Sequence, residues 1–280
     1  MGRIRRGWAL TKQSWQVLRG DKSLVIFPIL SSVFAVLAIV AIWASALLAR
    51  GVFQGRPVER HDPVLYIAGL AAAYVSSFIA IFFNVALAAC AQRSMRGEDT
   101  RVSEGISAAM QRIVAILGWT LVATTVGLII RALEERLGLV GRIVVWLVGA
   151  AFGVAAFFVI PVIALEGSGP IRSLKRSSAV IKARWGEGAT GAAAISIITF
   201  FLTLLIVLVG GAGGSALIAT RLLPFGIAVL AATVVVVIVV AFVSSALAQI
   251  FRVAVYQYAV TGETPGGFDS QLLQSAFARR

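Results

Sequence analysis

Residues 225–250 read FGIAVLAATVVVVIVVAFVSSALAQI, an apolar run of 26 residues without Asp, Glu, Lys or Arg. A transmembrane helix needs about 20 apolar residues to cross a hydrocarbon core of roughly 30 Å. The segment TVVVVIVV within this run has strand-like propensity in water, but the length of the whole run favours a helix. A backbone in lipid must satisfy its own hydrogen bonds, and a continuous apolar run is typical of a helix rather than of a barrel strand.

The sequence contains five more apolar runs of this kind, none of which contains a charged residue. The six predicted spans are 24–49, 64–91, 113–130, 143–165, 189–217 and 225–250. The first is expected to be an anchor rather than a cleaved signal peptide, because its apolar part is about twice as long as a signal core. We therefore predict an all-α membrane protein with an amphipathic segment (1–23), a six-helix transmembrane domain (24–260) and a tail (261–280).

The composition supports this prediction. Of 280 residues, 59% are hydrophobic and 13% are charged, whereas soluble proteins have about 45–50% and about 25%. A water-soluble domain cannot absorb that apolar excess, because its surface needs charge. The single Cys and single His exclude an intramolecular disulfide and a Cys/His zinc cluster, so we expect no metal site.

The net charge of +13 lies in short segments that flank the spans. This distribution favours a membrane surface over nucleic acid as the partner. Of the 25 basic residues, 18 lie on the side that carries both termini and 7 lie in the opposite connections. Because basic connections stay in the cytoplasm, we expect a multi-pass protein of the cell (plasma) membrane with both termini cytoplasmic.

Two of the basic segments, 3–22 and 170–185, have the pattern of interfacial amphipathic helices. Ile4, Trp8, Trp15 and Leu18 recur at helical spacing in the first, and Ile171, Leu174, Ser178, Ile181 and Trp185 do so in the second. The predicted membrane-surface residues are Arg3, Arg5, Arg6, Trp8, Lys12, Trp15, Arg19, Lys22, Arg172, Lys175, Arg176, Lys182, Arg184 and Trp185. They can recognise one anionic lipid, or they can set topology and bind any anionic leaflet, since each cation near the surface contributes roughly 1 kcal/mol.

A third amphipathic segment, Val102–Arg112, precedes the second pair of spans. Each pair of spans then follows a surface segment, so the predicted fold has two or three cytoplasmic interfacial helices. The order of elements is compatible with three repeats of a surface helix plus a hairpin, an interpretation that rests on order rather than on residue identity.

Few polar groups interrupt the spans. Asn84 is the deepest strong polar side chain and is expected to form a hydrogen bond across a helix interface. Glu166 and Arg252 follow the ends of spans four and six, where they can pair as a gate, as a headgroup contact or as a boundary salt bridge. These three residues form the candidate polar or boundary site.

Glycines mark two spans. Gly149 and Gly153 in span four, like Gly210 and Gly214 in span five, have the GxxxG spacing that permits close helix packing. The glycine cluster 210–214 can alternatively break span five, and broken helices point to transport sites. Pro161 is expected to kink or end span four.

The sequence contains no motif of a serine hydrolase, of a zinc protease or of a phosphate-binding loop. His61 lies in a polar connection, and Cys90 lies among alanines, where a packing role is expected. We therefore predict no enzyme, no catalytic residue and no cofactor.

Several stretches carry a resemblance to a known family. They are 5–18 (RRGWALTKQSWQVL), 130–136 (IRALEER), 161–167 (PVIALEG), 182–187 (KARWGE) and 250–259 (IFRVAVYQYA) with 261–263 (TGE). The chain resembles a family of uncharacterised prokaryotic integral membrane proteins, which implies six spans and assigns no activity. The order of elements is loosely similar to membrane domains fused to glycerophosphodiester phosphodiesterases. The sequence has no phosphodiesterase domain, so that activity is not expected.

These observations favour a non-enzymatic component that organises lipids or partner proteins at the inner leaflet. The expected partners are anionic membrane lipids, and a second copy of the chain or another membrane protein. The alternative is a small transporter or channel with a site inside the helix bundle.

Overall fold

The computed structural model describes residues 3–52, 62–184 and 189–269, and within them it leaves out the side chains of residues 3–10, 139, 184 and 189–197. The described residues form helices and connections, without a strand. In this part of the chain, six helical segments are long and apolar enough to cross a membrane. The predicted all-α class with six spans is confirmed.

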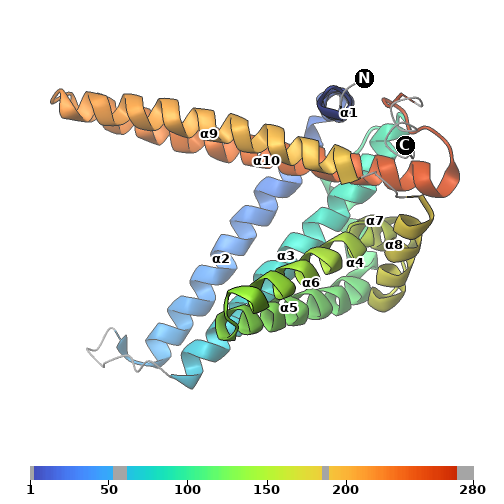
Figure 1. Ribbon diagram of the computed structural model, residues 1–280, viewed down its shortest axis with the longest axis horizontal. Helices are drawn as coiled ribbons and strands as arrows, with labels where there is room; N and C mark the ends of the chain where they lie inside the picture. The colour runs from blue at the N-terminus through green and yellow to red at the C-terminus, as the bar shows by residue number, and fades with distance from the viewer. Residues whose placement is uncertain (1–2, 53–61, 185–188, 270–280) are drawn as a thin grey trace. The chain divides into compact units, whose positions relative to one another are not determined.

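Each pair of long helices follows a shorter helix, in the order that the repeat requires (Figure 1). The elements are α1 (Arg3–Gly20), η1 (Lys22–Val25), α2 (Ile26–Ala49), α3 (Pro63–Met95), α4 (Val102–Gln111), α5 (Ile113–Arg136), α6 (Leu139–Ala155), α7 (Val159–Glu166), α8 (Pro170–Arg184), α9 (Ala189–Ala219) and α10 (Leu223–Thr261).

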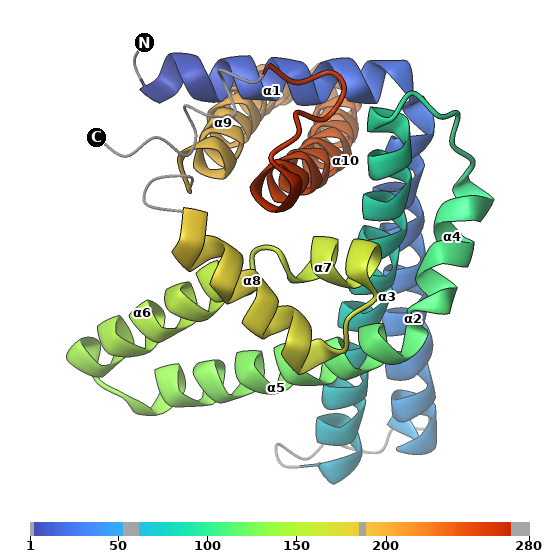
Figure 2. The ribbon, with the colours of Figure 1, turned by 90° about the vertical axis from the view of Figure 1, so that its right-hand side faces the viewer.

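The chain forms two compact units. One unit comprises Met1–Val25, Ser94–Asp99 and Arg184–Arg280, and therefore contains α1, η1, α9 and α10. The other comprises Ile26–Arg93 and Thr100–Ala183, and contains α2 and α4 to α8 with nearly all of α3. In the first unit α9 and α10 lie side by side, and α1 packs across both of them (Figure 2).

Glycines bring α9 and α10 close together. A Cβ atom added at Gly210 would lie 2.7 Å from Thr233 Cγ2, and one at Gly214 would lie 2.7 Å from Leu230 Cδ2. Both distances are shorter than real Cβ contacts, so a larger residue at either position would force the side chain opposite it to shift. The helix α9 runs without interruption through the glycine cluster. The possible break in span five is therefore wrong, and the glycines serve close packing.

The interruption lies in span four instead. Helix α6 ends at Ala155 and α7 begins at Val159, so the single helix predicted for 143–165 is two helices. Pro161 explains the position of the break, because its ring cannot donate to the carbonyl of Phe157 and clashes with it in a continuous helix. The backbone N–H of Phe158, which lies at the break, donates to Ser177 Oγ at 3.0 Å.

Helices of the second unit also meet at a glycine. A Cβ atom at Gly105 of α4 would lie 2.6 Å from Phe27 Cζ and 2.7 Å from Cys90 Sγ. Cys90 is buried at this contact and its thiol donates to the carbonyl of Arg101. Its environment is that of a packing residue, as the sequence suggests.

Large apolar side chains cover the outer surfaces of the long helices. Phe200 and Phe201 on α9 are each 62% exposed, and Val114 on α5 is 79% exposed. A soluble protein would not present so much contiguous apolar surface to water. Lipid is the solvent in which this surface is stable.

Candidate functional site

The helix α8 joins a buried serine face to an outward basic face. Its first residue is Pro170, whose fixed φ suits a helix start and whose missing N–H needs no partner there. Ser173, Ser177 and Val180 recur at helical spacing and are buried. The hydroxyl of Ser173 donates to the carbonyl of Ser168, and Ser177 accepts from Phe158, so the polar face of α8 is the one that packs on the protein.

The predicted apolar face of α8 lies at the edge of this packing contact and is partly exposed. Ile171 is 52% exposed, and Leu174 and Ile181 are half-buried. The exposed side chains of Arg172, Lys175, Arg176 and Lys182 lie beside this stripe, on the face directed away from Ser173 and Ser177. The helix contains no acidic residue. An apolar stripe beside an exposed basic face is typical of a helix at a membrane surface.

One cation of α8 has an ionic partner. Arg176 Nε lies 3.1 Å from Glu166 Oε1 at the end of α7, and both side chains are partly exposed. A pair of this exposure contributes at most about 1 kcal/mol. Glu166 thus pairs within its own unit; Arg252 belongs to the other unit, and the pairing of Glu166 with Arg252 stays a prediction.

The helix α1 packs on α9 and α10. Ser14, Val17 and Leu18 are buried, whereas Trp15 is 44% exposed. Of the predicted apolar stripe, Leu18 is therefore buried and Trp15 stays partly exposed. Lys12, Arg19 and, on η1, Lys22 are exposed. The side chains of Arg3, Arg5, Arg6, Trp8 and Arg184, and all of His61 and Trp185, lie outside the described residues.

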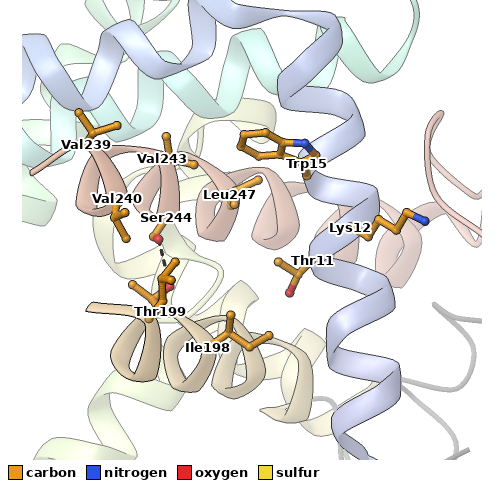
Figure 3. A pocket seen from close by; sticks show the side chains of 11 residues that line it. Thr11, Lys12, Trp15, Ile198, Thr199, Val239, Val240, Val243, Ser244 and Leu247 are labelled. Carbon is orange, nitrogen blue, oxygen red and sulfur yellow. Dashed lines mark hydrogen bonds between the residues drawn. The ribbon is translucent and has the colours of Figure 1, made fainter. Parts of the chain in front are cut away.

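Lys12 and Trp15 line an apolar groove together with side chains of α9 and α10 (Figure 3). Thr199 and Ser244 also line the groove and are not among the site residues predicted from the sequence. The Thr199 hydroxyl donates to Ser244 Oγ at 3.0 Å. Small hydroxyl side chains within two apolar runs are the only signal for this site in the sequence, and such side chains are common in transmembrane helices.

Three other predicted residues lie apart from these surfaces. The Asn84 amide donates to the Ala80 carbonyl of its own helix at 2.8 Å, so the expected bond across a helix interface is not the one that forms. Gly149 lies against Ile130, but an added Cβ at Gly153 would meet no described atom within 4 Å. The GxxxG spacing in α6 therefore makes a helix contact at one glycine only.

The described residues do not form a group that could bind a metal ion. Within 3–52, 62–184 and 189–269 no group of three His, Cys, Asp or Glu side chains lies close enough to hold a metal ion.

Comparison with known protein families identifies the family of the chain. The model of a family of unknown function, DUF6159, matches residues 64–267. No curated protein matches the chain, and no solved structure does. The looser likeness to membrane domains fused to phosphodiesterases stays a prediction. The match runs from the start of α3 to beyond the end of α10 and covers most of the chain, which therefore belongs to this family of unknown function.

Proposed function

We propose that this chain is a non-enzymatic integral membrane protein that gathers anionic lipids at one membrane surface. The observation that carries the proposal is the orientation of α8, which buries Ser173 and Ser177 against the protein and exposes its cations, with a partly exposed apolar stripe between these two faces. The excess of basic residues on the side of the termini supports the cytoplasmic leaflet of the cell membrane as that surface.

The energetics favour anionic lipids over zwitterionic ones. Arg172, Lys175 and Lys182 are exposed and have no acidic residue on their own helix. Each cation near an anionic surface contributes about 1 kcal/mol. Ile171 and Ile181 add apolar contact at the boundary between headgroups and chains. Together they hold negative headgroups around α8 without a closed pocket.

Neutralising these three cations should abolish the enrichment of anionic lipid near α8. The full chain, with Cys90→Ala and a fluorescent label on Ala179→Cys, is reconstituted with acceptor-labelled phosphatidylglycerol or phosphatidylcholine. In the unmodified protein, energy transfer to the anionic acceptor should exceed that to the zwitterionic one. In the variant with Arg172→Gln, Lys175→Gln and Lys182→Gln the two should become equal, because about 3 kcal/mol of attraction is removed.

The matched control removes three exposed arginines, by Arg131→Gln and Arg136→Gln at the far end of α5 and by Arg142→Gln at the start of α6. Arg131 and Arg136 lie more than about 18 Å along α5 from Gly118, which contacts Pro170 of α8, and Arg142 donates to the carbonyl of Glu134 at the same end of α5. The control should keep the full enrichment. Enrichment that survives in the α8 variant, or that falls equally in both variants, would refute the proposal.

The interrupted fourth span favours a second candidate function, the transport of a small solute. Discontinuous helices are typical of transporter binding sites, and here the break lies at residues 156–158. Solute uptake into proteoliposomes tests this candidate. Uptake that depends on the protein and changes with Ser177→Ala would support it, and no uptake across a broad solute panel would exclude it.

A further inference from the structure

The groove between α1, α9 and α10 has a volume of about 670 Å³, within the range of roughly 300–1,000 Å³ that small-molecule sites have. Its walls are almost entirely apolar. They consist of Thr11, Lys12 and Trp15 from α1, Ile198, Thr199 and Leu202 from α9, and Val239, Val240, Val243, Ser244 and Leu247 from α10. Leu202 is 45% exposed and Val239 is 52% exposed, so the groove opens sideways to the surroundings of the helices.

The groove exists because the packing of α9 on α10 changes along their length. Near the connection between them, Gly210, Gly214 and Gly226 allow close contact of the two backbones. Toward α1 the glycines give way to larger side chains, and the helices meet through Thr199 and Ser244. These hydroxyls bond to each other, which reduces the cost of placing them beside an apolar ligand.

The level of the groove follows from α10. Its apolar run ends at Ile250, so Leu247 lies within one turn of the end of that run and Val239 lies about two turns deeper. Lys12 and Trp15 of α1 line the same groove, and a cation and an indole ring suit the boundary between headgroups and chains.

We propose that this groove holds one acyl chain of an anionic phospholipid, with the lipid phosphate at the Lys12 ammonium. The stem of Lys12 contributes to the rim and its ammonium points out of the groove (Figure 3), which is where a phosphate lies when its chain follows Val243 and Leu202 inward. The charge is complementary, because α1 contains basic residues and no acidic one. The half-exposed Trp15 ring suits the boundary between headgroup and chain.

The proposal deepens the proposed function and rests on lipid as the partner, but it concerns a single bound molecule rather than a lipid-enriched surface. Its residues belong to the unit of α1, α9 and α10, whereas α8 belongs to the other unit except for its last residue. Variants of the groove and variants of α8 therefore test separate statements.

Native mass spectrometry of the full chain tests the groove. The protein is extracted from vesicles of equal parts phosphatidylglycerol and phosphatidylcholine, and the lipids retained per protomer are counted. We expect one phosphatidylglycerol per protomer. Val243→Phe and, separately, Leu202→Phe fill the groove and should lower this occupancy at least tenfold. Lys12→Gln should leave a lipid bound but remove the preference for phosphatidylglycerol.

Two controls match these variants. Val234→Phe places the same ring on an exposed position of α10 outside the groove, and Arg19→Gln removes an exposed cation of α1 outside it. Both should retain one phosphatidylglycerol, as should the triple α8 variant. Helical circular dichroism equal to that of the unmodified chain shows that each variant is folded.

Other outcomes overturn the proposal. Unchanged retention in both groove-filling variants would do so, as would retention without preference in the unmodified chain. A second protein copy in place of the lipid would assign the groove to a helix interface instead. Loss of the retained lipid in the α8 variant alone would place it at α8, which would refute the groove site and leave the proposed function standing.

Discussion

Gly226→Ala should destabilise the α9–α10 pair, although alanine is the better helix former. A Cβ atom at residue 226 would lie 2.8 Å from the carbonyl oxygen of Gly214 and 3.1 Å from the backbone nitrogen of Ile218. These are backbone atoms, so they cannot withdraw as a flexible side chain would, and the helices must move apart. Overpacking of this kind costs about 1–3 kcal/mol, and Gly226→Val should cost more.

The measurement is reversible unfolding in mixed micelles of dodecyl maltoside and dodecyl sulfate, followed by helical circular dichroism. The controls are Gly211→Ala and Gly213→Ala on α9, where an added Cβ would meet no described atom within 4 Å. These should be neutral or stabilising by up to about 1 kcal/mol, because alanine has the higher helix propensity. Equal destabilisation at all three positions would contradict a specific close contact at Gly226.

Ser177→Ala should be the most destabilising single substitution in α8. The hydroxyl of Ser177 accepts the buried N–H of Phe158 at the interruption between α6 and α7. Removal of the acceptor of a buried backbone N–H costs about 1–3 kcal/mol. The same micelle titration measures the loss, and hydrogen exchange at residues 156–158 should increase as the break loosens.

Ser178→Ala is the matched control. Its hydroxyl donates to the carbonyl of Leu174 within the same helix, a carbonyl that already belongs to the helical ladder, so its removal should change stability by less than about 0.5 kcal/mol. If Ser178→Ala and Ser177→Ala were equally destabilising, the loss would reflect helix propensity and not the bond that closes the break.

Hydropathy locates all six spans, because crossing a hydrocarbon core requires a length of apolar chain that is visible in one sequence. It does not reveal the interruption of span four, since residues 156–158 are as apolar as their neighbours and only Pro161 marks the break. It predicts an amphipathic surface helix at α8 without indicating the contact that holds this helix to the protein, which Ser173 and Ser177 make.

The candidate groove is likewise only partly predictable from the sequence. Lys12 and Trp15 stand out in the sequence as a basic and an aromatic residue beside a span, and so they are predictable as surface residues. That they lie opposite Thr199 and Ser244 depends on the packing of the first helix on the last pair, nearly 190 residues away along the chain.

The sequence by itself determines that this is an all-α chain with six helices long and apolar enough to cross a membrane. It also determines where those helices lie along the chain and how the charged residues are distributed around them. The tertiary structure alone decides which helices are neighbours: α1 packs on α9 and α10, and glycines close one end of the α9–α10 pair while the other end stays open. The physical reason is that lipid is as apolar as a leucine side chain, so hydrophobicity drives a helix into the membrane without selecting its partner there. Partners are chosen by close fit, by small residues and by a few hydrogen bonds, and these depend on positions in space that no single segment encodes.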